Sequence, residues 1–228
     1  MANKKGLLIL VFAVCIAGSA FALPEFKFSI GAGGYITNDI SGGTRGEIGD
    51  VKMAMSNDYH QTPIGGGFLF LDFTFAELSF GIFGGKGLFY NSYEDNSSLF
   101  ISEIPTSLVG LDIGLMGKYP FAIGSIFYLY PLLGMDYRII AIMNDGDGNK
   151  IADAVDHSDL WFRLGIGMDL FFIPALYLRL GFTGGLKLPN KFERDAVEYY
   201  KSLGMDAKAY PGFGFDLKLA IGYRFSRR

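Results

Sequence analysis

The stretch PGFGFDLKLAIGYRF, residues 211–225, decides the fold class. Aromatic and aliphatic residues occupy every second position, and glycine, alanine and charged residues fill the positions between them. An alternation of period two predicts a β-strand, because successive side chains on a strand point to opposite faces. One face is continuously apolar, and the other carries Asp216, Lys218 and Arg224. This pattern is typical of a membrane-spanning β-barrel, whose wall faces lipid outside and a polar lumen inside.

The composition agrees with a membrane protein built from strands. Half of the 228 residues are apolar, the mean hydropathy is +0.28, and there are 22 phenylalanines and 13 tyrosines. The 20 basic residues face 23 acidic ones, which gives no indication of a nucleic-acid partner. After residue 22 no apolar run approaches the roughly 18 residues of a spanning helix. The length and the lack of a linker predict a single domain.

The first 22 residues have the features of a secretory signal peptide. Lys4 and Lys5 form a basic start, residues 7–16 are apolar, and Ala20-Phe21-Ala22 is a small-x-small cleavage signal. The alternative, a membrane-anchoring helix, needs nearer 20 apolar residues. We therefore expect a signal peptide at 1–22 and a transmembrane β-barrel at 23–228, located in the outer membrane. Cys15 lies in the signal peptide, so the exported chain would contain no disulfide.

The remaining chain predicts an all-β fold, an eight-stranded antiparallel transmembrane barrel. We expect strands at 25–36, 63–73, 77–90, 105–117, 124–142, 159–172, 175–189 and 211–225. Long polar connections at 37–62, 91–104, 143–158 and 190–210 alternate with short ones at 74–76, 118–123 and near Phe172-Ile173-Pro174. In bacterial barrels the short turns face the periplasm and the long loops face outward. A ten-stranded barrel would require a long loop to be split.

The two faces of the predicted strands differ in chemistry. We expect these charged residues to point into the lumen: Lys27, Asp112, Asp136, Arg138, Arg163, Asp169, Arg179, Lys187, Asp216, Lys218 and Arg224. We expect lipid contact at Leu78, Phe80, Ile82, Val109, Leu111, Ile113, Leu115, Leu160, Phe162, Leu164, Ile166, Met168, Leu170, Leu176, Leu178, Leu180 and Phe182. Mixed charges in so narrow a lumen predict a plug of ion pairs. The alternative is a narrow pore lined by the same residues.

Aromatic residues gather near the short turns, as an interfacial girdle requires. We expect this girdle to contain Phe73, Phe75, Tyr119, Phe121, Phe171, Phe172 and Tyr177.

The chain resembles the small outer-membrane β-barrel family typified by OmpX and the transmembrane domain of OmpA. The resemblance lies in the signal peptide, in residues 130–137 (YPLLGMDY) within a central strand and in the aromatic last strand. It implies a monomer in outer-membrane lipid, inserted by the barrel assembly machinery that reads the last strand at Lys218, Ala220, Tyr223 and Phe225. This chain departs from the family where Ala220 replaces the usual glycine and residues 226–228 follow the final aromatic.

No catalytic, cofactor-binding or metal-binding residue is assigned, and the chain is predicted not to be an enzyme. Some eight-stranded barrels edit lipid A with a histidine, a serine and an acid. Here the candidates are His60 and the tetrapeptide Asp156-His157-Ser158-Asp159. Adjacent side chains point apart and cannot form a relay, and the serine is not two positions after the histidine, as the deacylase pattern requires.

Three outer loops carry further features. Oxygen-bearing side chains at Asp145, Asp147, Asn149, Asp153 and Asp156 have the spacing of a calcium loop, but Lys150 replaces the required glycine. The same residues are ordinary in turns.

The fourth outer loop contains a predicted helix. Asn190, Glu193 and Gly204 predict a capped amphipathic helix at about 191–203, which rests on the rim, covers the lumen or packs on other loops. Leu99-Phe100-Ile101 is either an exposed contact site or a plug on the rim.

These features predict an integral outer-membrane barrel with a structural or surface-interaction role carried by its extracellular loops. A host or cell-surface partner would bind there. The competing function, which OmpW-type barrels suggest, is a narrow passive channel for small or hydrophobic solutes.

Overall fold

A computed structural model describes residues 26–40, 42–58, 64–94 and 98–225. The predicted signal peptide and His60 lie outside these described residues. Within them, no helix is long and apolar enough to cross a membrane.

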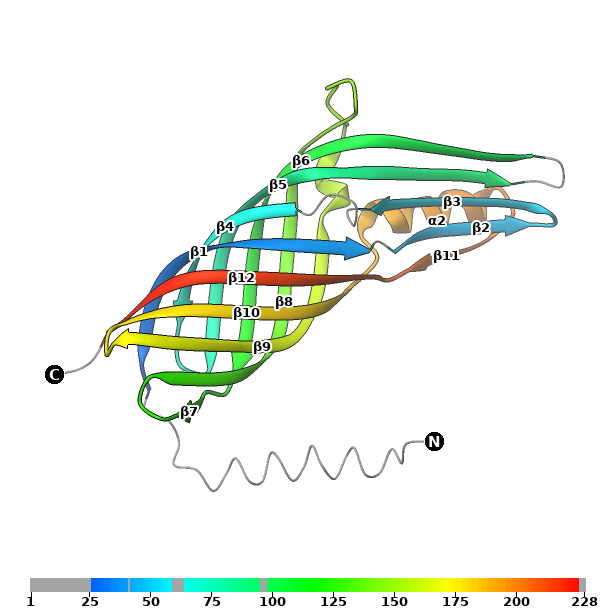
Figure 1. Cartoon of the computed structure of the whole chain (residues 1–228). Helices are drawn as coiled ribbons and strands as arrows, with labels where there is room; N and C mark the ends of the chain where they lie inside the picture. The colour runs from blue at the N-terminus through cyan, green and yellow to red at the C-terminus, as the bar shows by residue number, and fades with distance from the viewer. Residues whose placement is uncertain (1–25, 41, 59–63, 95–97, 226–228) are drawn as a thin grey trace, which may run out of the picture.

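Eight antiparallel strands close into a barrel (Figure 1). They are β1 (Phe28–Ile40), β4 (Ile64–Asp72), β5 (Ala76–Glu94), β6 (Leu99–Lys118), β8 (Phe127–Asn144), β9 (Asp159–Ile173), β10 (Leu176–Lys187) and β12 (Gly212–Phe225). Each pairs with the next in this order, and β12 pairs with β1 to close the ring. All eight predicted strands are confirmed, and none of the long loops adds a strand to the closed wall.

The exterior of this wall is apolar. Leu164 is 66% exposed and Ile82 is 62% exposed, and the other residues predicted to face lipid are exposed or half-buried. In water so many exposed apolar side chains would be unfavourable, whereas in a bilayer they contact acyl chains. The closed hydrogen-bonding ring also leaves the wall without a free strand edge, which hydrocarbon requires. The chain is therefore an integral outer-membrane β-barrel.

Two members of the predicted aromatic girdle were assigned wrongly. Phe171 and Tyr177 are 6% and 0% exposed, and their rings contact one another inside the barrel with centroids 4.8 Å apart. Period two explains the error, because Phe171 and Tyr177 alternate with the lipid-facing Leu170 and Leu176. Phe172 and Phe73 do lie on the outside, at 61% and 37% exposure.

The long outer loops contain more regular structure than the sequence suggested. The first loop forms β2 (Gly43–Ile48) and β3 (Val51–Asp58), and the fourth contributes β11 (Asp206–Tyr210). The predicted second loop at 91–104 is mostly the tip of a long β5–β6 hairpin. Because β3 pairs with β5 beyond the point where β4 ends, the order β11-β2-β3-β5-β6 forms a sheet outside the barrel. We call it the extracellular sheet.

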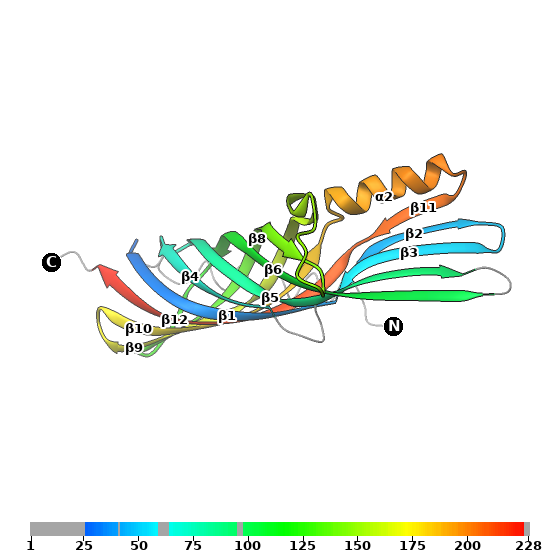
Figure 2. The ribbon, with the colours of Figure 1, turned by 90° about the horizontal axis from the view of Figure 1, so that it is seen from above.

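The predicted helix is confirmed as α2 (Lys191–Ser202). Asn190 accepts a hydrogen bond from the Glu193 N–H, and the Glu193 carboxylate accepts one from the Asn190 N–H, which is a capping box. Gly204 follows the helix with φ +82°, a left-handed conformation that glycine adopts without strain. The helix lies across β2 and β11 on one face of the extracellular sheet, so it packs on neighbouring loops (Figure 2).

The opposite end of the barrel carries the short turns and the end of β12 (Figure 1). We call it the periplasmic end, following the orientation expected from the loop lengths. A three-residue strand, β7 (Phe121–Ile123), pairs with the start of β8 in the longest of these turns. A short 3-10 helix, η1 (Ala154–His157), lies at the other end in the third outer loop.

Candidate functional site

Two groups of buried ion pairs fill the lumen. The first, which we call the inner charge cluster, consists of Asp72, Glu77, Lys118, Asp169 and Arg179. Arg179 binds all three carboxylates, with its Nε 2.7 Å from Asp169 Oδ1, and Lys118 pairs with Asp72. All five side chains are at most 8% exposed. Since β4, β5, β6, β9 and β10 each supply one member, the cluster joins the wall across the lumen.

The second group, the outer charge cluster, lies nearer the extracellular sheet. Its members are Asp39, Asp112, Asp136, Arg138, Arg163 and Asp216. Arg138 pairs with Asp39, Asp112 and Asp216, and Arg163 Nε lies 2.9 Å from Asp136 Oδ2. The Arg163 guanidinium carbon also lies 4.2 Å from the centre of the Trp161 ring. Buried charges are tolerated because each has an opposite charge and hydrogen bonds.

The prediction of inward-facing charges is confirmed. Of the residues listed for the lumen, eight are buried: Asp112, Asp136, Arg138, Arg163, Asp169, Arg179, Lys187 and Asp216. Lys27, Lys218 and Arg224 are half-buried. The sequence analysis missed Asp39, Asp72, Glu77 and Lys118. The inward direction of Glu77 could have been read from the sequence, because it alternates with the lipid-facing Leu78. Asp39 and Lys118 were missed because they fall in the predicted connections 37–62 and 118–123 and not in predicted strands.

Aromatic rings occupy the space between the charges. Phe70, Tyr130 and Tyr177 are at most 1% exposed, and the Arg179 guanidinium carbon lies 4.5 Å from the centre of the Phe70 ring. A cavity beside Glu77, Arg179 and Lys218 has a volume of only about 20 Å³, enough for one water molecule. The lumen is therefore a packed core, and the predicted plug describes it better than the pore.

A third polar group ties the barrel rim to the extracellular part. The Lys187 ammonium lies 2.7 Å from Glu193 Oε1 and 3.5 Å from Asp159 Oδ1. The Asn190 side-chain amide donates to Asp159 at 3.1 Å. Lys187 ends β10, Asp159 begins β9, and Glu193 lies in the first turn of α2. The capping box of α2 is thus anchored directly on two wall strands, which fixes where the helix begins.

The extracellular sheet is covered on one face over only part of its width. Ala207, Gly46, Met53, Tyr93 and Phe100 are successive partners across the five strands and share one face. In α2, Tyr200 packs against Gly46, and Val197 belongs to the same cluster as Met53 and Ala207.

The β5–β6 side of this face lies beyond the helix. Phe100 is 63% exposed and Tyr93 is 37% exposed. On the opposite face, Ile101 is 47% exposed and lines a hollow of about 380 Å³ together with Arg45, Lys52 and Ser92. The Phe100-Ile101 part of the predicted apolar patch is therefore exposed, and it does not plug the rim.

The third loop is a polar turn held by its own backbone. Asp145 accepts hydrogen bonds from the Asn149 side-chain amide at 3.1 Å and from the Asn149 and Asp147 N–H groups at 2.8 and 3.0 Å. These bonds hold the pKa of the Asp145 carboxyl below its usual value. Among the described residues, no three histidine, cysteine or acidic side chains converge to hold a metal ion. The Asp145 carboxylate thus stabilises the turn, a role that aspartate ordinarily has in loops.

His157 lies in η1, where it stacks on Phe192 of α2 with ring centroids 4.2 Å apart. It is 5% exposed. Burial lowers its pKa, opposed by the nearby carboxylates of Asp159 and Asp156. The ring thus joins two outer loops as a packing element.

Comparisons with known proteins give structural matches alone. No family model matches the chain, and no curated protein matches it by sequence. One similar solved structure is Neisserial surface protein A, with 10% sequence identity and a TM-score of 0.43; the match covers 87% of this chain and 97% of that one. Another is the outer membrane protein OprG from Pseudomonas aeruginosa, with 12% identity and a TM-score of 0.47; the match covers 90% of this chain and 99% of that one. Ail, the attachment invasion locus protein of Yersinia pestis, also matches, with 14% identity and a TM-score of 0.37; the match covers 89% of this chain and 100% of that one. The assignment of the fold rests on the strand pairing and the apolar exterior described above.

Proposed function

We propose that this barrel acts at the cell surface as a binding protein, without catalysis, and that the extracellular sheet is its working part. The observation that carries the proposal is the exposed pair Phe100 and Ile101, one on each face of the β5–β6 hairpin tip. Figure 2 shows the outer halves of β5 and β6 extending beyond the closed barrel, beside β2 and β3. Exposed apolar side chains outside lipid mark sites of contact with a partner.

The edge of the same hairpin supports this role. β6 pairs with β8 only from Ser107 inward, so no described strand covers the outer edge of residues 99–106. Unpaired N–H and C=O groups on such an edge can pair with an extended segment of another protein. A partner could therefore use both main-chain hydrogen bonds and the two apolar side chains.

The absence of catalysis is part of the proposal. Of the two histidine candidates, His157 is the one among the described residues, and it is buried against Phe192. A general base must reach its substrate within hydrogen-bonding distance, which this packing prevents. The alternative function as a passive channel finds no support in the packed lumen, where both charge clusters occupy the route.

Binding by intact cells that display the protein tests the proposal. The double substitution Phe100→Ser, Ile101→Thr is compared with Val155→Ser, which removes an equally exposed apolar side chain from η1, away from the sheet. On arrays of immobilised proteins and glycans, wild-type cells should bind at least one class that cells lacking the protein do not. The double variant should bind it about tenfold more weakly, the effect of losing a hot-spot contact. Equal binding by cells without the protein would refute the proposal.

A further inference from the structure

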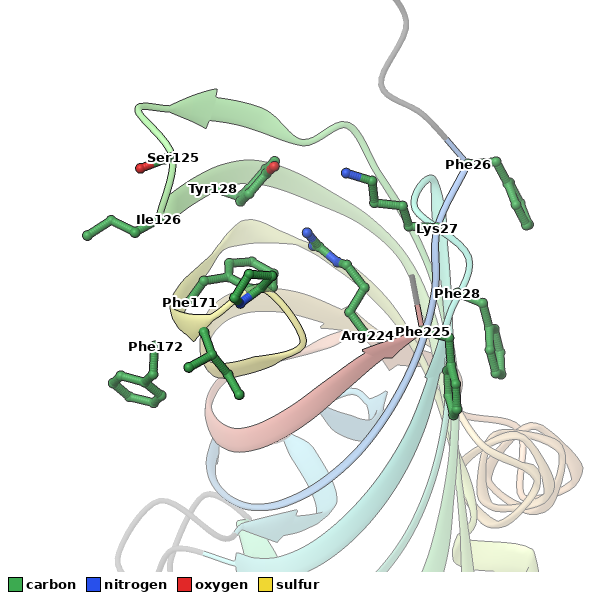
Figure 3. A pocket seen from close by; sticks show the side chains of 12 residues that line it. Phe26, Lys27, Phe28, Ser125, Ile126, Tyr128, Phe171, Phe172, Arg224 and Phe225 are labelled. Atoms are coloured by element: carbon green, nitrogen blue, oxygen red, sulfur yellow. The ribbon is translucent and has the colours of Figure 1, made fainter. Parts of the chain in front are cut away.

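A cavity of about 1020 Å³ opens at the periplasmic end of the barrel (Figure 3). Its wall comes from the start of β1, the turn before β8, the β9–β10 turn and the end of β12. None of its lining residues belongs to the inner or the outer charge cluster. The cavity is therefore a feature separate from the packed lumen above it.

Among the described residues that line this cavity, the charged ones are both basic. Lys27 and Arg224 are the charged residues among those that line it, and no carboxylate does so within the part of the chain that the structure describes. Both side chains reach into the opening (Figure 3). Two cations in a concave surface of low dielectric constant produce a positive potential that attracts anions.

Aromatic rings, and not carboxylates, hold Arg224 in place. Its guanidinium carbon lies 4.0 Å from the centre of the Phe171 ring and 5.0 Å from that of Tyr128. Its Nε is buried and has no hydrogen-bond partner. By contrast, Arg138, Arg163 and Arg179 all bind carboxylates in the charge clusters. Arg224 therefore has a fixed position and, among the described residues, no carboxylate partner, which leaves its guanidinium charge available to an anion.

The depth of the cavity indicates where that anion would come from. Exposed aromatic rings surround the rim on the lipid side, with Phe26 72% and Phe172 61% exposed, and Figure 3 shows both pointing away from the lumen. Such rings lie at the level of the lipid headgroups. The mouth of the cavity thus lies at the depth of the phosphates in the periplasmic leaflet.

We infer that the periplasmic mouth binds a phosphate group. Arg224 donates hydrogen bonds to the phosphate, Lys27 supplies a second positive charge, and the rings of Phe171 and Tyr128 hold the Arg224 guanidinium in place. The phosphate belongs either to a phospholipid headgroup of the periplasmic leaflet or to a free phosphate in the periplasm. The inner charge cluster, with three carboxylates and two cations, keeps it from moving deeper.

The test uses the folded protein in non-ionic detergent, titrated separately with dihexanoylphosphatidylglycerol, inorganic phosphate and dihexanoylglycerol, which lacks phosphate. Proton–nitrogen NMR of the arginine side chains reports the Nε–H resonance of Arg224, and the same titration gives the dissociation constant. We expect saturable shifts with the phosphatidylglycerol. Saturation by inorganic phosphate as well would identify free phosphate as a ligand, and a response to the lipid alone would identify a headgroup. The inference would be overturned if dihexanoylglycerol shifted the Arg224 resonance as much as the phosphatidylglycerol does. It would also be overturned if neither the phosphatidylglycerol nor inorganic phosphate shifted the resonance.

Variants separate binding from folding. Arg224→Gln should weaken binding about tenfold, as expected for a lost charged hydrogen bond. Arg194→Gln removes one positive charge from the exposed surface of α2 and should leave the dissociation constant unchanged. If Arg224→Gln does not fold, Lys27→Gln is the second test. Lys27 lies immediately before β1 and lines the same cavity, so this variant should also weaken binding, and an unchanged dissociation constant would contradict the proposed site.

Discussion

At the scale of single residues, inward-facing glycines set how closely the lumen can be filled. Tyr130 lies opposite Gly167 across β8 and β9, and a Cβ on Gly167 would lie 2.2 Å from a carbon of the Tyr130 ring. The ring cannot retreat freely, because its hydroxyl donates to Asp169 at 2.9 Å. Gly181, the partner of Gly167 on β10, has room: its added Cβ would lie 3.7 Å from Lys218.

This pair of neighbouring glycines gives a matched prediction. Gly167→Ala should lower the free energy of unfolding by about 1–3 kcal/mol, the usual cost of overpacking. Gly181→Ala, also inward-facing, should change it by less than about 0.5 kcal/mol. Urea unfolding in lipid vesicles measures both. Equal effects would mean that the lumen has room around Tyr130 and is not packed as described.

At the scale of elements, α2 is held at its start by the wall and by η1. The Lys187–Glu193 ion pair fixes the first turn on the rim, and the stacked rings of His157 and Phe192 join that turn to the third loop. Burial lowers the pKa of His157, so the neutral ring is the form that fits. Lys187 favours the neutral form as well, whereas Asp159 and Asp156 oppose it.

The contact between α2 and η1 should therefore depend on pH. Because the folded-state pKa of His157 lies below the unfolded value of about 6.5, its contribution to stability is complete above pH 6.5. It is lost as the pH falls from there toward the folded-state pKa. Hydrogen exchange of the α2 amides, corrected for intrinsic rates, should show less protection at pH 5 than at pH 7.5. His157→Phe keeps the stack without the titration, and its protection should be the same at both pH values. A wild type without pH dependence would contradict the prediction.

At the scale of the whole molecule, the two charge clusters close the barrel at two levels. Each cluster contains members from several strands, so the route through the lumen is blocked by paired side chains and not by a loop. An ion passing through would have to lose its hydration and displace these pairs, which is costly in a narrow wall of low dielectric constant.

Wild-type protein in planar bilayers should accordingly show little conductance. Arg179→Ala leaves three carboxylates with Lys118 as their remaining cation, so it should destabilise the barrel by about 3–5 kcal/mol and raise the leak current. Arg194→Ala, at an exposed position on α2, should do neither. Large and steady current steps from the wild type would show that the clusters do not block the lumen and would favour the channel function.

The orientation of the whole barrel can be tested through the absence of cysteine from the predicted mature chain. Ser202→Cys places a thiol at the exposed end of α2, and Ser125→Cys places one in the turn before β8. A membrane-impermeant maleimide should label the first in intact cells and the second only after the outer membrane is permeabilised, because the long loops face outward. Labelling of Ser125→Cys in intact cells would reverse the orientation.

The sequence alone determined the features that depend on local spacing. Period two in segments such as 211–225 gave the eight strands and which side chains face the lumen, because the alternation of a strand is a local property. Asn190, Glu193 and Gly204 likewise determined the limits of α2, since a capping box and a left-handed C-terminus involve only neighbouring residues.

The tertiary structure decided which residues meet. Arg179 contacts Glu77 across 102 positions of sequence, and Arg138 contacts Asp39 across 99. Such partners depend on the closure and register of the barrel, which no local pattern records. The extracellular sheet was unpredictable for the same reason: β3 is a strand because the outer half of β5 offers it an edge where β4 ends. Polar segments such as these form strands only when a neighbouring strand supplies their hydrogen bonds.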